Sequence, residues 1–375
     1  MFSRREFLKG LLVTAALASL EPGSLLAAPK QGEPLLVAVH LTGGNDALNT
    51  LVPYKNELYR RARPNLALGN KNLLSTENNL ALHPSLGRLH QRFQQGEVRF
   101  FTGIGREDHD RSHFRSSDIW HSLGRPGEEG WMATLSKRLD CVPVSLGPSI
   151  SQAVACPDHP PVGLVGDRPT QLPGDEKLHQ AWFDMYRNWK THHPAGKRLK
   201  SSAAVVEELT EKLERKMMAT RPPVPFGGDD FGKRFELAYR LVASGFPAKT
   251  MHLSVGKFDT HSGQLGSHAQ QLEQFDRASQ AFLQNLERLN RPTVLMVYSE
   301  FGRRVSENFS GGTDHGAGGL AWLMGKGVKG GIVGDYRLET LRDGDISTQI
   351  PYQELYRDAV GSAFGAEQAG DLFTG

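Results

Sequence analysis

The stretch Thr293–Gly319, TVLMVYSEFGRRVSENFSGGTDHGAGG, decides the fold that this sequence predicts. It opens with an apolar run, Thr293–Tyr298, that has no helical period and is typical of a strand buried on both faces of a parallel sheet. The run ends at the polar cluster Ser299–Arg304, and a glycine-flanked Thr313–Gly316 follows. Because ligands of open α/β sheets bind outside the carboxyl ends of the strands, the stretch predicts a binding site at this edge.

Other parts of the chain repeat this arrangement of an apolar run followed by polar residues. The further predicted strands are Leu35–Leu41, Val98–Thr102, Val142–Leu146 and Met251–Val255. Between them, apolar residues at helical spacing predict helices at Leu82–Gln94, Ser201–Thr220, Phe231–Ser244, Leu272–Leu289 and Tyr352–Phe364. Strands that alternate with helices favour a doubly wound α/β fold with a mostly parallel central sheet. A helical and loop insert is expected at about residues 148–230, within one domain that spans residues 29–375.

Charge and composition exclude several classes of protein. The 375 residues carry 44 Lys and Arg against 41 Asp and Glu, a formal net charge of +3, so bulk charge does not favour nucleic acid as a partner. The sequence also lacks a haem-attachment motif, a set of iron–sulfur cysteines and a dinucleotide glycine fingerprint. A redox or cofactor protein therefore ranks last among the functions considered.

The N-terminus is typical of an export signal. Arg4 and Arg5 form a twin-arginine signature, an apolar segment Gly10–Leu20 follows, and small residues lie near Ala28. The apolar segment is shorter than the roughly 20 residues that span a bilayer, so we expect no stable membrane span after cleavage. We expect residues 1–28 to be a signal peptide that engages the twin-arginine translocation machinery, with the mature protein periplasmic or extracellular. The alternative is an amphipathic first helix.

Two cysteines, Cys141 and Cys156, remain in that oxidising setting. A disulfide between them would close a short loop and contribute about 3 kcal/mol. The sequence leaves open whether they are bonded. The absence of a CxxC spacing argues against a two-cysteine metal site.

The polar residues that follow the strands have the chemistry of a divalent metal site. Asp46, Asp259 and Glu300 would supply charge, and His261 and His315 would supply imidazole nitrogen, which favours zinc or another transition metal. Each residue also has a structural alternative. Asp46 can stabilise a tight turn, and Glu300 can form an ion pair with a neighbouring arginine.

Five motifs in linked order carry a resemblance to a known family. They are HLTGGNDALNTLVPY (40–54), DRSHFRSSDIW (110–120), FDTHSGQLGSH (258–268), YSEFGRR (298–304) with EN (307–308), and GGTDHGAGG (311–319). Together they resemble a bacterial family of twin-arginine-exported proteins that carries a domain of unknown function and groups with the alkaline phosphatase and sulfatase superfamily. The resemblance implies a three-layer α/β/α sandwich and hydrolysis of phosphate or sulfate esters at a metal site.

The resemblance also implies roles for individual residues. The metal ligands would be Asp46, Asp259, His261, His268, Glu300 and His315, and the ion would be zinc, manganese or calcium. Ser112, or a metal-bound water, would be the nucleophile. A mechanistic hypothesis follows from these roles: Arg303, Arg111 or Arg115 would hold the oxygens of a small-molecule or glycan ester, and His113 would protonate the leaving group. Ser112 can alternatively cap a helix, and His113 can be a packed, satisfied side chain.

Of two departures from the superfamily pattern, the one at Phe301 favours a second function and the one at Ser112 argues against sulfatase chemistry. Phe301 stands where a histidine ligand is usual, which argues against a second metal ion. Ser112 lacks the modifiable nucleophile motif of sulfatases. The alternative function is therefore a non-catalytic binding or assembly protein on the same fold.

Overall fold

The computed structural model of the chain describes residues 31–108, 110–125, 128–156, 161–165 and 220–370, scattered positions between 181 and 219, and residues 372 and 373. The predicted signal peptide, the predicted helix Ser201–Thr220 except its last turn, and much of the predicted insert lie outside the described residues.

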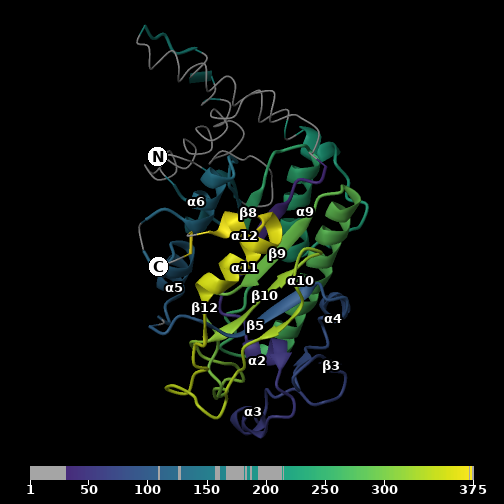
Figure 1. Ribbon diagram of the computed structural model, residues 1–375, viewed down its shortest axis with the longest axis vertical. Coiled ribbons are helices and arrows are strands. Elements are labelled where there is room, and N and C mark those ends of the chain that lie inside the picture. The colour runs from purple at the N-terminus through teal and green to yellow at the C-terminus, as the bar shows by residue number, and fades with distance from the viewer. Residues whose placement is uncertain are drawn as a thin grey trace.

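A large central sheet organises the fold (Figure 1). Its strand order is β11-β5-β10-β9-β1-β8-β6-β7, and β12 also pairs with β5. Only β10 runs antiparallel to its neighbours, and the other pairings among the described strands of this sheet are parallel. The mostly parallel sheet predicted from the sequence is therefore confirmed. The strands are β1 (Leu35–Leu41), β5 (Val98–Gly105), β6 (Val144–Gly147), β7 (Val162–Val165), β8 (Thr250–Val255), β9 (Thr293–Tyr298), β10 (Gly319–Met324), β11 (Gly331–Val333) and β12 (Ile350–Pro351).

Helices cover both faces of this sheet and give the molecule its three layers (Figure 1). One face packs against α4 (Gly87–Gln94), α9 (Asp230–Ala243) and α10 (Gln264–Arg288). The other packs against α5 (His113–His121), α6 (Trp131–Arg138), α11 (Tyr352–Phe364) and α12 (Ala366–Ala369). The predicted α/β/α sandwich is confirmed.

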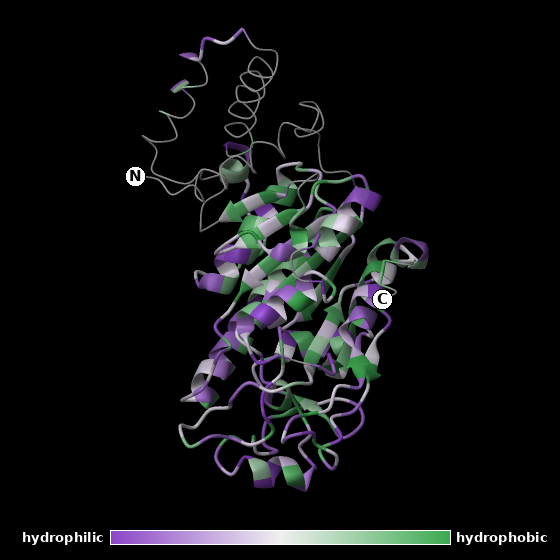
Figure 2. Cartoon of the chain, turned by 90° about the vertical axis from the view of Figure 1, so that its left-hand side faces the viewer, coloured by the Kyte–Doolittle hydropathy of each residue, from purple (hydrophilic) through white to green (hydrophobic). Residues whose placement is uncertain are grey.

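Strand β1 shows why its sequence gives a central strand. Leu35, Val37 and Val39 belong to the core on the α9 and α10 side, whereas Leu36 and Ala38 belong to the core on the α5 and α11 side. Side chains alternate along a strand, so a continuous apolar run suits a strand buried on both faces. In Figure 2 the strands are largely hydrophobic, and the helices that flank them mix hydrophobic with hydrophilic residues.

Shorter elements complete the fold. They are α2 (Ala47–Thr50), β2 (Leu51–Val52), α3 (Glu57–Ala62), β3 (Leu74–Ser75), β4 (Ala81–Leu82) and the 3-10 turn η2 (Gln152–Val154). Strands β2, β4 and β3 form a small separate sheet. Because Ala81–Leu82 pairs within that sheet, α4 begins at Gly87 and not at the predicted Leu82.

Two further observations concern predictions about export and the cysteines. Among the described helices, none is both long and apolar enough to cross a membrane. Cys141 and Cys156 are both buried and are not joined by a disulfide, so the bond that the sequence left open is absent here. Burial raises the pKa of the Cys141 thiol, which keeps it in its neutral form.

Candidate metal centre

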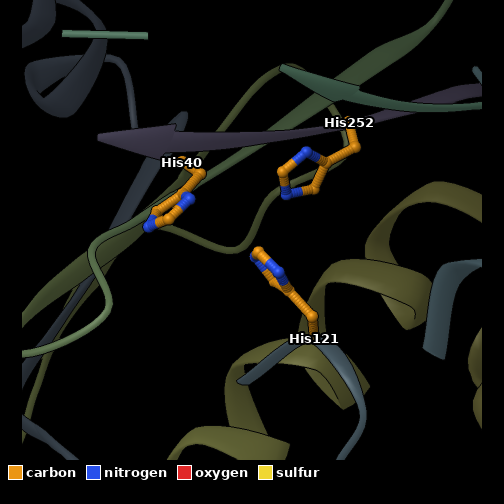
Figure 3. Close-up of side chains that lie close together, drawn as sticks. All are labelled: His40, His121 and His252. Atoms are coloured by element: carbon orange, nitrogen blue, oxygen red, sulfur yellow. The ribbon is translucent and has the colours of Figure 1, made fainter. Parts of the chain in front are cut away.

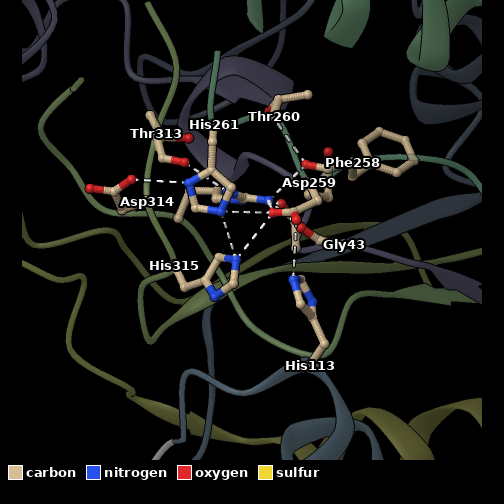
Figure 4. A network of polar contacts seen from close by, with 12 residues as sticks. Gly43, His113, Phe258, Asp259, Thr260, His261, Thr313, Asp314 and His315 are labelled. Atoms are coloured by element: carbon tan, nitrogen blue, oxygen red, sulfur yellow. Dashed lines mark hydrogen bonds and ion pairs between the residues drawn. The ribbon is translucent and has the colours of Figure 1, made fainter. Parts of the chain in front are cut away.

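Four of the predicted site residues meet at the carboxyl edge of the central sheet (Figure 4). His113 begins α5, Asp259 and His261 follow β8, and His315 lies just before β10. Because β10 is antiparallel to β5 and β9, its start lies at the edge where the parallel strands end. The antiparallel strand therefore brings a late histidine to the same edge as residues that follow parallel strands.

Asp259 is the centre of this cluster. Its Oδ1 lies 3.0 Å from His261 Nε2 and 3.1 Å from His315 Nε2, and these two nitrogens are 3.0 Å apart. Its Oδ2 lies 3.4 Å from His113 Nε2. His113, Asp259 and His315 each offer a ligand atom within 4.8 Å of the others. The cluster therefore joins one carboxylate with three imidazoles.

The spacing and chemistry of these atoms fit a metal ion. In a tetrahedral zinc site with bonds of 2.0–2.1 Å, neighbouring ligand atoms lie about 3.3 Å apart, close to the separations around Asp259 Oδ1. A set dominated by imidazoles suits a transition ion better than calcium, which prefers oxygen. The side chains of Asp259 and His261 are 46% and 45% exposed, so the cluster is open to solvent and to a substrate. The cluster can therefore bind a metal ion from the surface.

Arg303 does not have the role that the sequence predicted for it. Its guanidinium is fully buried and donates hydrogen bonds to the carbonyls of Gly43, Gly44, Phe258 and Thr313. It also donates to Asp259 Oδ1 at 2.7 Å. A buried arginine with these partners cannot hold the oxygens of a substrate, so Arg303 positions Asp259 and the surrounding loops.

The pKa of Asp259 reflects these neighbours. Burial by itself would raise that pKa, but hydrogen bonds from Arg303 and His315 outweigh burial and lower it to about 2. The carboxyl is therefore ionised at neutral pH, as a metal ligand must be.

Glu300, predicted to be a ligand, lies behind the cluster. Its Oε1 accepts hydrogen bonds from His113 Nδ1 at 2.7 Å and from the Gly43 backbone at 2.9 Å, and its Oε2 lies 2.9 Å from His40 Nε2. Burial opposes its charge, but the hydrogen bonds from His113 and His40 hold the pKa of Glu300 well below its ordinary value. Both oxygens are occupied, so Glu300 orients histidines and is not placed to bind an ion itself.

The contact with Glu300 also changes the interpretation of His113. A carboxylate only accepts hydrogen bonds, so His113 Nδ1 is the donor and Nε2, which faces Asp259, keeps its lone pair in the neutral ring. A carboxylate behind a histidine in this way is the usual outer partner of a metal ligand. The geometry favours His113 as a ligand over the predicted role as the acid that protonates the leaving group.

The phenyl ring of Phe301 packs against two imidazoles of the cluster. Its ring centroid lies 4.9 Å from that of His113 and 4.6 Å from that of His315, and its side chain is buried. Phe301 therefore packs against two imidazoles at the position where the resemblance implied a histidine. It fixes their orientation through contact and supplies no ligand atom.

Asp46 and His268 lie in the interior and do not join the cluster. Asp46 caps α2 and pairs with Arg63, whose Nη1 lies 2.6 Å from Asp46 Oδ2. Burial alone would raise the pKa of Asp46, but the charge and hydrogen bond of Arg63 lower it overall. His268 Nε2 lies 3.0 Å from Asn45 Oδ1, and burial lowers the pKa of His268 to about 4. The structure assigns both residues to a buried polar network.

The predicted nucleophile and anion-binding arginines lie near the start of α5. Ser112 is exposed at the N-cap position, and its side chain makes no capping hydrogen bond. Arg111 Nη2 pairs with Asp345 Oδ2 at 2.7 Å, while the Arg111 carbonyl lies 2.7 Å from His315 Nδ1. Arg115 lies 3.5 Å from Asp110 and its side chain is 72% exposed. Of the predicted arginines, Arg115 is the most accessible to a substrate.

Some residues that shape the site were given no individual role from the sequence. His40, the partner of Glu300, is the last but one residue of β1, and a polar residue in such a buried strand is an unusual signal. Asp314 lies 3.0 Å from His261 Nδ1, and Asn308 donates to the same carboxylate at 3.1 Å. These partners orient His261 as Glu300 orients His113. Asn308 belongs to the EN pair that carries part of the family resemblance, but the sequence predicted no role for it.

Part of the chain matches a known protein family. Residues 172–339 match the model of a family described as a protein of unknown function (DUF1501), which confirms the resemblance to a family with a domain of unknown function. A search of curated proteins found no match.

Solved structures similar to this chain include phosphatases and sulfatases. The alkaline phosphatase of the Antarctic bacterium TAB5 has 10% sequence identity and a TM-score of 0.39, covering 90% of this chain and 99% of that one. The PsFucS1 sulfatase of Pseudoalteromonas sp. has 10% identity and a TM-score of 0.40, covering 98% of this chain and 73% of that one. The C-terminal periplasmic domain of EcEptC from Escherichia coli, in complex with zinc, has 8% identity and a TM-score of 0.37, covering 80% and 75%.

Proposed function

We propose that this protein is an exported metal-dependent hydrolase of phosphate or sulfate esters. The observation that carries the proposal is the convergence of Asp259 with His113, His261 and His315 at a solvent-open edge of the sheet. The metal is zinc or manganese, because three of the four candidate ligand groups are imidazoles. When bound, such an ion polarises the ester and stabilises the negative charge that develops during hydrolysis.

The chain's own residues supply the remaining parts of the proposed reaction. Glu300 and Asp314 hold the rings of His113 and His261, so that a nitrogen of each faces Asp259. Arg115, two residues after His113 and mostly exposed, is the proposed donor to an oxygen of the ester. The Ser112 hydroxyl, free of a capping bond beside His113, is the proposed nucleophile, and water is the alternative.

The exposed cluster is open to solvent, and this openness favours some classes of substrate over others. A cavity of about 730 Å³ at the same end of β5 is lined by Arg106, Arg125, Tyr352 and their neighbours, and none of the cluster's histidines lines it. A surface site of this kind suits an ester group at the end of a small molecule or a glycan, and the proposed substrate is of that class.

The test combines metal analysis with a panel of esters. The purified mature chain is expected to bind zinc or manganese at the cluster and to hydrolyse at least one ester among nitrophenyl phosphate, nitrophenyl sulfate and sulfated or phosphorylated sugars. Asp259→Asn and His315→Ala should lose that metal and the turnover together. His90→Gln, a partly exposed histidine on α4, is the matched control and should keep both.

Two outcomes would contradict the hydrolase. Retention of all bound metal by both Asp259→Asn and His315→Ala would remove the cluster as its binding site. Bound metal with no turnover of any ester would favour the alternative, a binding or assembly protein. The occupied guanidinium of Arg303 and the phenyl ring of Phe301 are the observations that favour this alternative.

A further inference from the structure

A second group of histidines lies buried between the sheet and α5 (Figure 3). His40 comes from β1, His252 from β8 and His121 from the last turn of α5. They are 4%, 0% and 6% exposed. Each offers a ligand nitrogen within 4.8 Å of the other two, and Figure 3 shows the three rings turned toward a common space.

The strand positions of these residues make the group unusual. His40 and His252 lie on the face of the sheet where Leu36, Ala38 and Met296 form the apolar core around Trp120 and Tyr356. Neutral imidazole is costly to place in such a core unless its polar nitrogens have partners. Burial lowers the pKa values of His121 and His252 well below the ordinary value, so both rings are neutral.

The hydrogen bonds do not satisfy the group. The Tyr298 hydroxyl lies 2.8 Å from His252 Nε2 and 3.0 Å from His121 Nε2, so it can donate to one of these nitrogens and accept from the other, and it engages only one nitrogen of each ring. Ser151 Oγ lies 3.5 Å from His121 Nδ1 and from His252 Nε2, at the limit of a hydrogen bond. His252 Nδ1 is buried with no hydrogen-bond partner. The cluster therefore holds an imidazole lone pair or N–H group that the protein leaves unmatched.

His40 already has the outer partner of a metal ligand. Its Nε2 donates to the Glu300 carboxylate at 2.9 Å, which fixes the tautomer and leaves the lone pair on Nδ1. A carboxylate that accepts from the far nitrogen of a histidine is the usual second partner of metal-ligating imidazole.

We propose that His40, His121 and His252 form a second, buried metal site that takes a zinc-type transition ion. Three neutral imidazoles without a carboxylate oxygen among them exclude magnesium and calcium as preferred ions. The bound ion accepts the lone pairs of the ring nitrogens that lack hydrogen-bond partners. Because the site is buried, the ion exchanges slowly with solvent. The inference does not rest on the proposed hydrolase, because the two sites use different ligands and share only Glu300.

The test uses zinc as the probe and the mature full chain. After purification with zinc and dialysis against a chelator, the wild-type protein should keep one equivalent of zinc that resists the chelator. His252→Gln should lose this equivalent, whereas His315→Ala should keep it. His83→Gln, a buried histidine outside the group, is the matched control and should also keep it.

A readout on the wild-type protein decides the case if His252→Gln does not fold. X-ray absorption of the chelator-resistant zinc should show scattering from about three imidazoles. Absence of resistant zinc, even after refolding from denaturant with zinc present, would overturn the buried site. So would a folded His252→Gln variant that retains it. Neither result bears on metal binding at the exposed cluster, because that binding is measured with Asp259→Asn and His315→Ala.

Discussion

At the scale of single residues, the exposed cluster depends on side chains that would not touch a ligand. Arg303 donates to four backbone carbonyls from the loops after β1 and β8 and the loop before β10, and it also donates to Asp259. The loop after β1 is more than two hundred residues away in the sequence from the other two loops and from Arg303 itself. One guanidinium therefore ties together the loops that carry the ligands.

Replacement of Arg303 tests this role. Arg303→Lys keeps the charge but has fewer donors and a different geometry, so it leaves buried carbonyls unsatisfied. We expect it to lower the free energy of unfolding by about 3 kcal/mol and to weaken metal binding. Urea denaturation and zinc titration measure the two effects. Arg304→Lys, at a partly exposed neighbour, should change either quantity little. Equal effects of the two substitutions would contradict the role of Arg303.

Glu300 gives a second prediction at this scale. Glu300→Gln is nearly isosteric, but its amide nitrogen donates where one carboxylate oxygen accepted, so it cannot accept from both His113 and His40. We expect zinc affinity at the exposed cluster to fall by about 10-fold to 100-fold, as is typical when an outer partner of a metal ligand is lost. Competition with a chromogenic chelator measures this affinity. Unchanged affinity would show that His113 does not bind the ion.

At the scale of elements, the segment between β9 and β10 forms a tight hairpin that sets the position of His315. The Gly302 and Ala317 backbones pair, as do those of Gly316 and Gly302, and Arg303 forms a β-bridge with His315. The two strands of this hairpin approach so closely that a Cβ on Gly316 would collide with the backbone of Arg303. The glycines that the sequence shows around His315 are therefore required by backbone packing.

This packing predicts a local defect. Gly316→Ala should push His315 away from Asp259 and reduce zinc affinity at the exposed cluster by at least about 10-fold, since misplacing one ligand costs more than about 1.4 kcal/mol. Gly311→Ala is the control, because nothing lies near the added methyl group at the tip of the hairpin. Its positive φ adds some backbone strain. Isothermal titration with zinc compares them. Full affinity in Gly316→Ala would show that the hairpin does not position His315.

Helix α10 shows where the sequence could not predict an element. The apolar pattern predicts a start at Leu272, but the helix begins at Gln264. Its first two turns bury polar residues, Gln264 and His268, against Asp46 and Asn45, so hydrophobic periodicity gives no signal there. The strands β1 and β9 were predicted with their observed bounds, because continuous apolar runs mark buried strands directly. Buried polar networks depend on partners distant in the sequence and are not visible in local patterns.

The buried end of α10 makes stability depend on pH. Burial lowers the pKa of His268 from 6.5 to about 4, so the unfolded chain binds a proton between these pH values that the folded chain refuses. The contribution of neutral His268 to the free energy of unfolding is therefore fully present above pH 6.5. As the pH falls toward 4, this free energy decreases by on the order of 3 kcal/mol. Urea unfolding of wild type and His268→Gln at pH 7.5, 6 and 5 tests this. Identical pH slopes in the two proteins would contradict it.

The same contrast applies to the candidate site. The sequence identified Asp259, His261 and His315 through their place after strands and between glycines, and the structure brings them together. It could not separate Asp46 from them, because only the fold shows that Arg63 occupies its carboxylate. Nor could the sequence distinguish an arginine that binds substrate from one that binds backbone carbonyls. The difference lies in whether the side chain is exposed or buried, and tertiary packing decides that.

At the scale of the whole molecule, the N-terminal sequence predicts where the protein works. Replacing both Arg4 and Arg5 by lysine should stop export, because the twin-arginine pair is the recognised part of the signal. Cell fractionation followed by immunoblotting should show the precursor retained in the cytoplasm. Lys9→Arg keeps the charge and is the control. Normal appearance of the double variant outside the cytoplasm would contradict the proposed route.

The reversed direction of β10 has a consequence for how relatives of this protein can vary. His315 enters the site from the base of a hairpin that is closed by the Gly302 and Gly316 backbones, whereas residues 305–312 form its outer part. Additional residues inserted near Phe309, a fully exposed side chain, would extend outward beside the cluster without displacing the histidine. The length of this hairpin can therefore vary while His315 keeps its position, and in the proposed hydrolase such variation would change the surface beside the substrate.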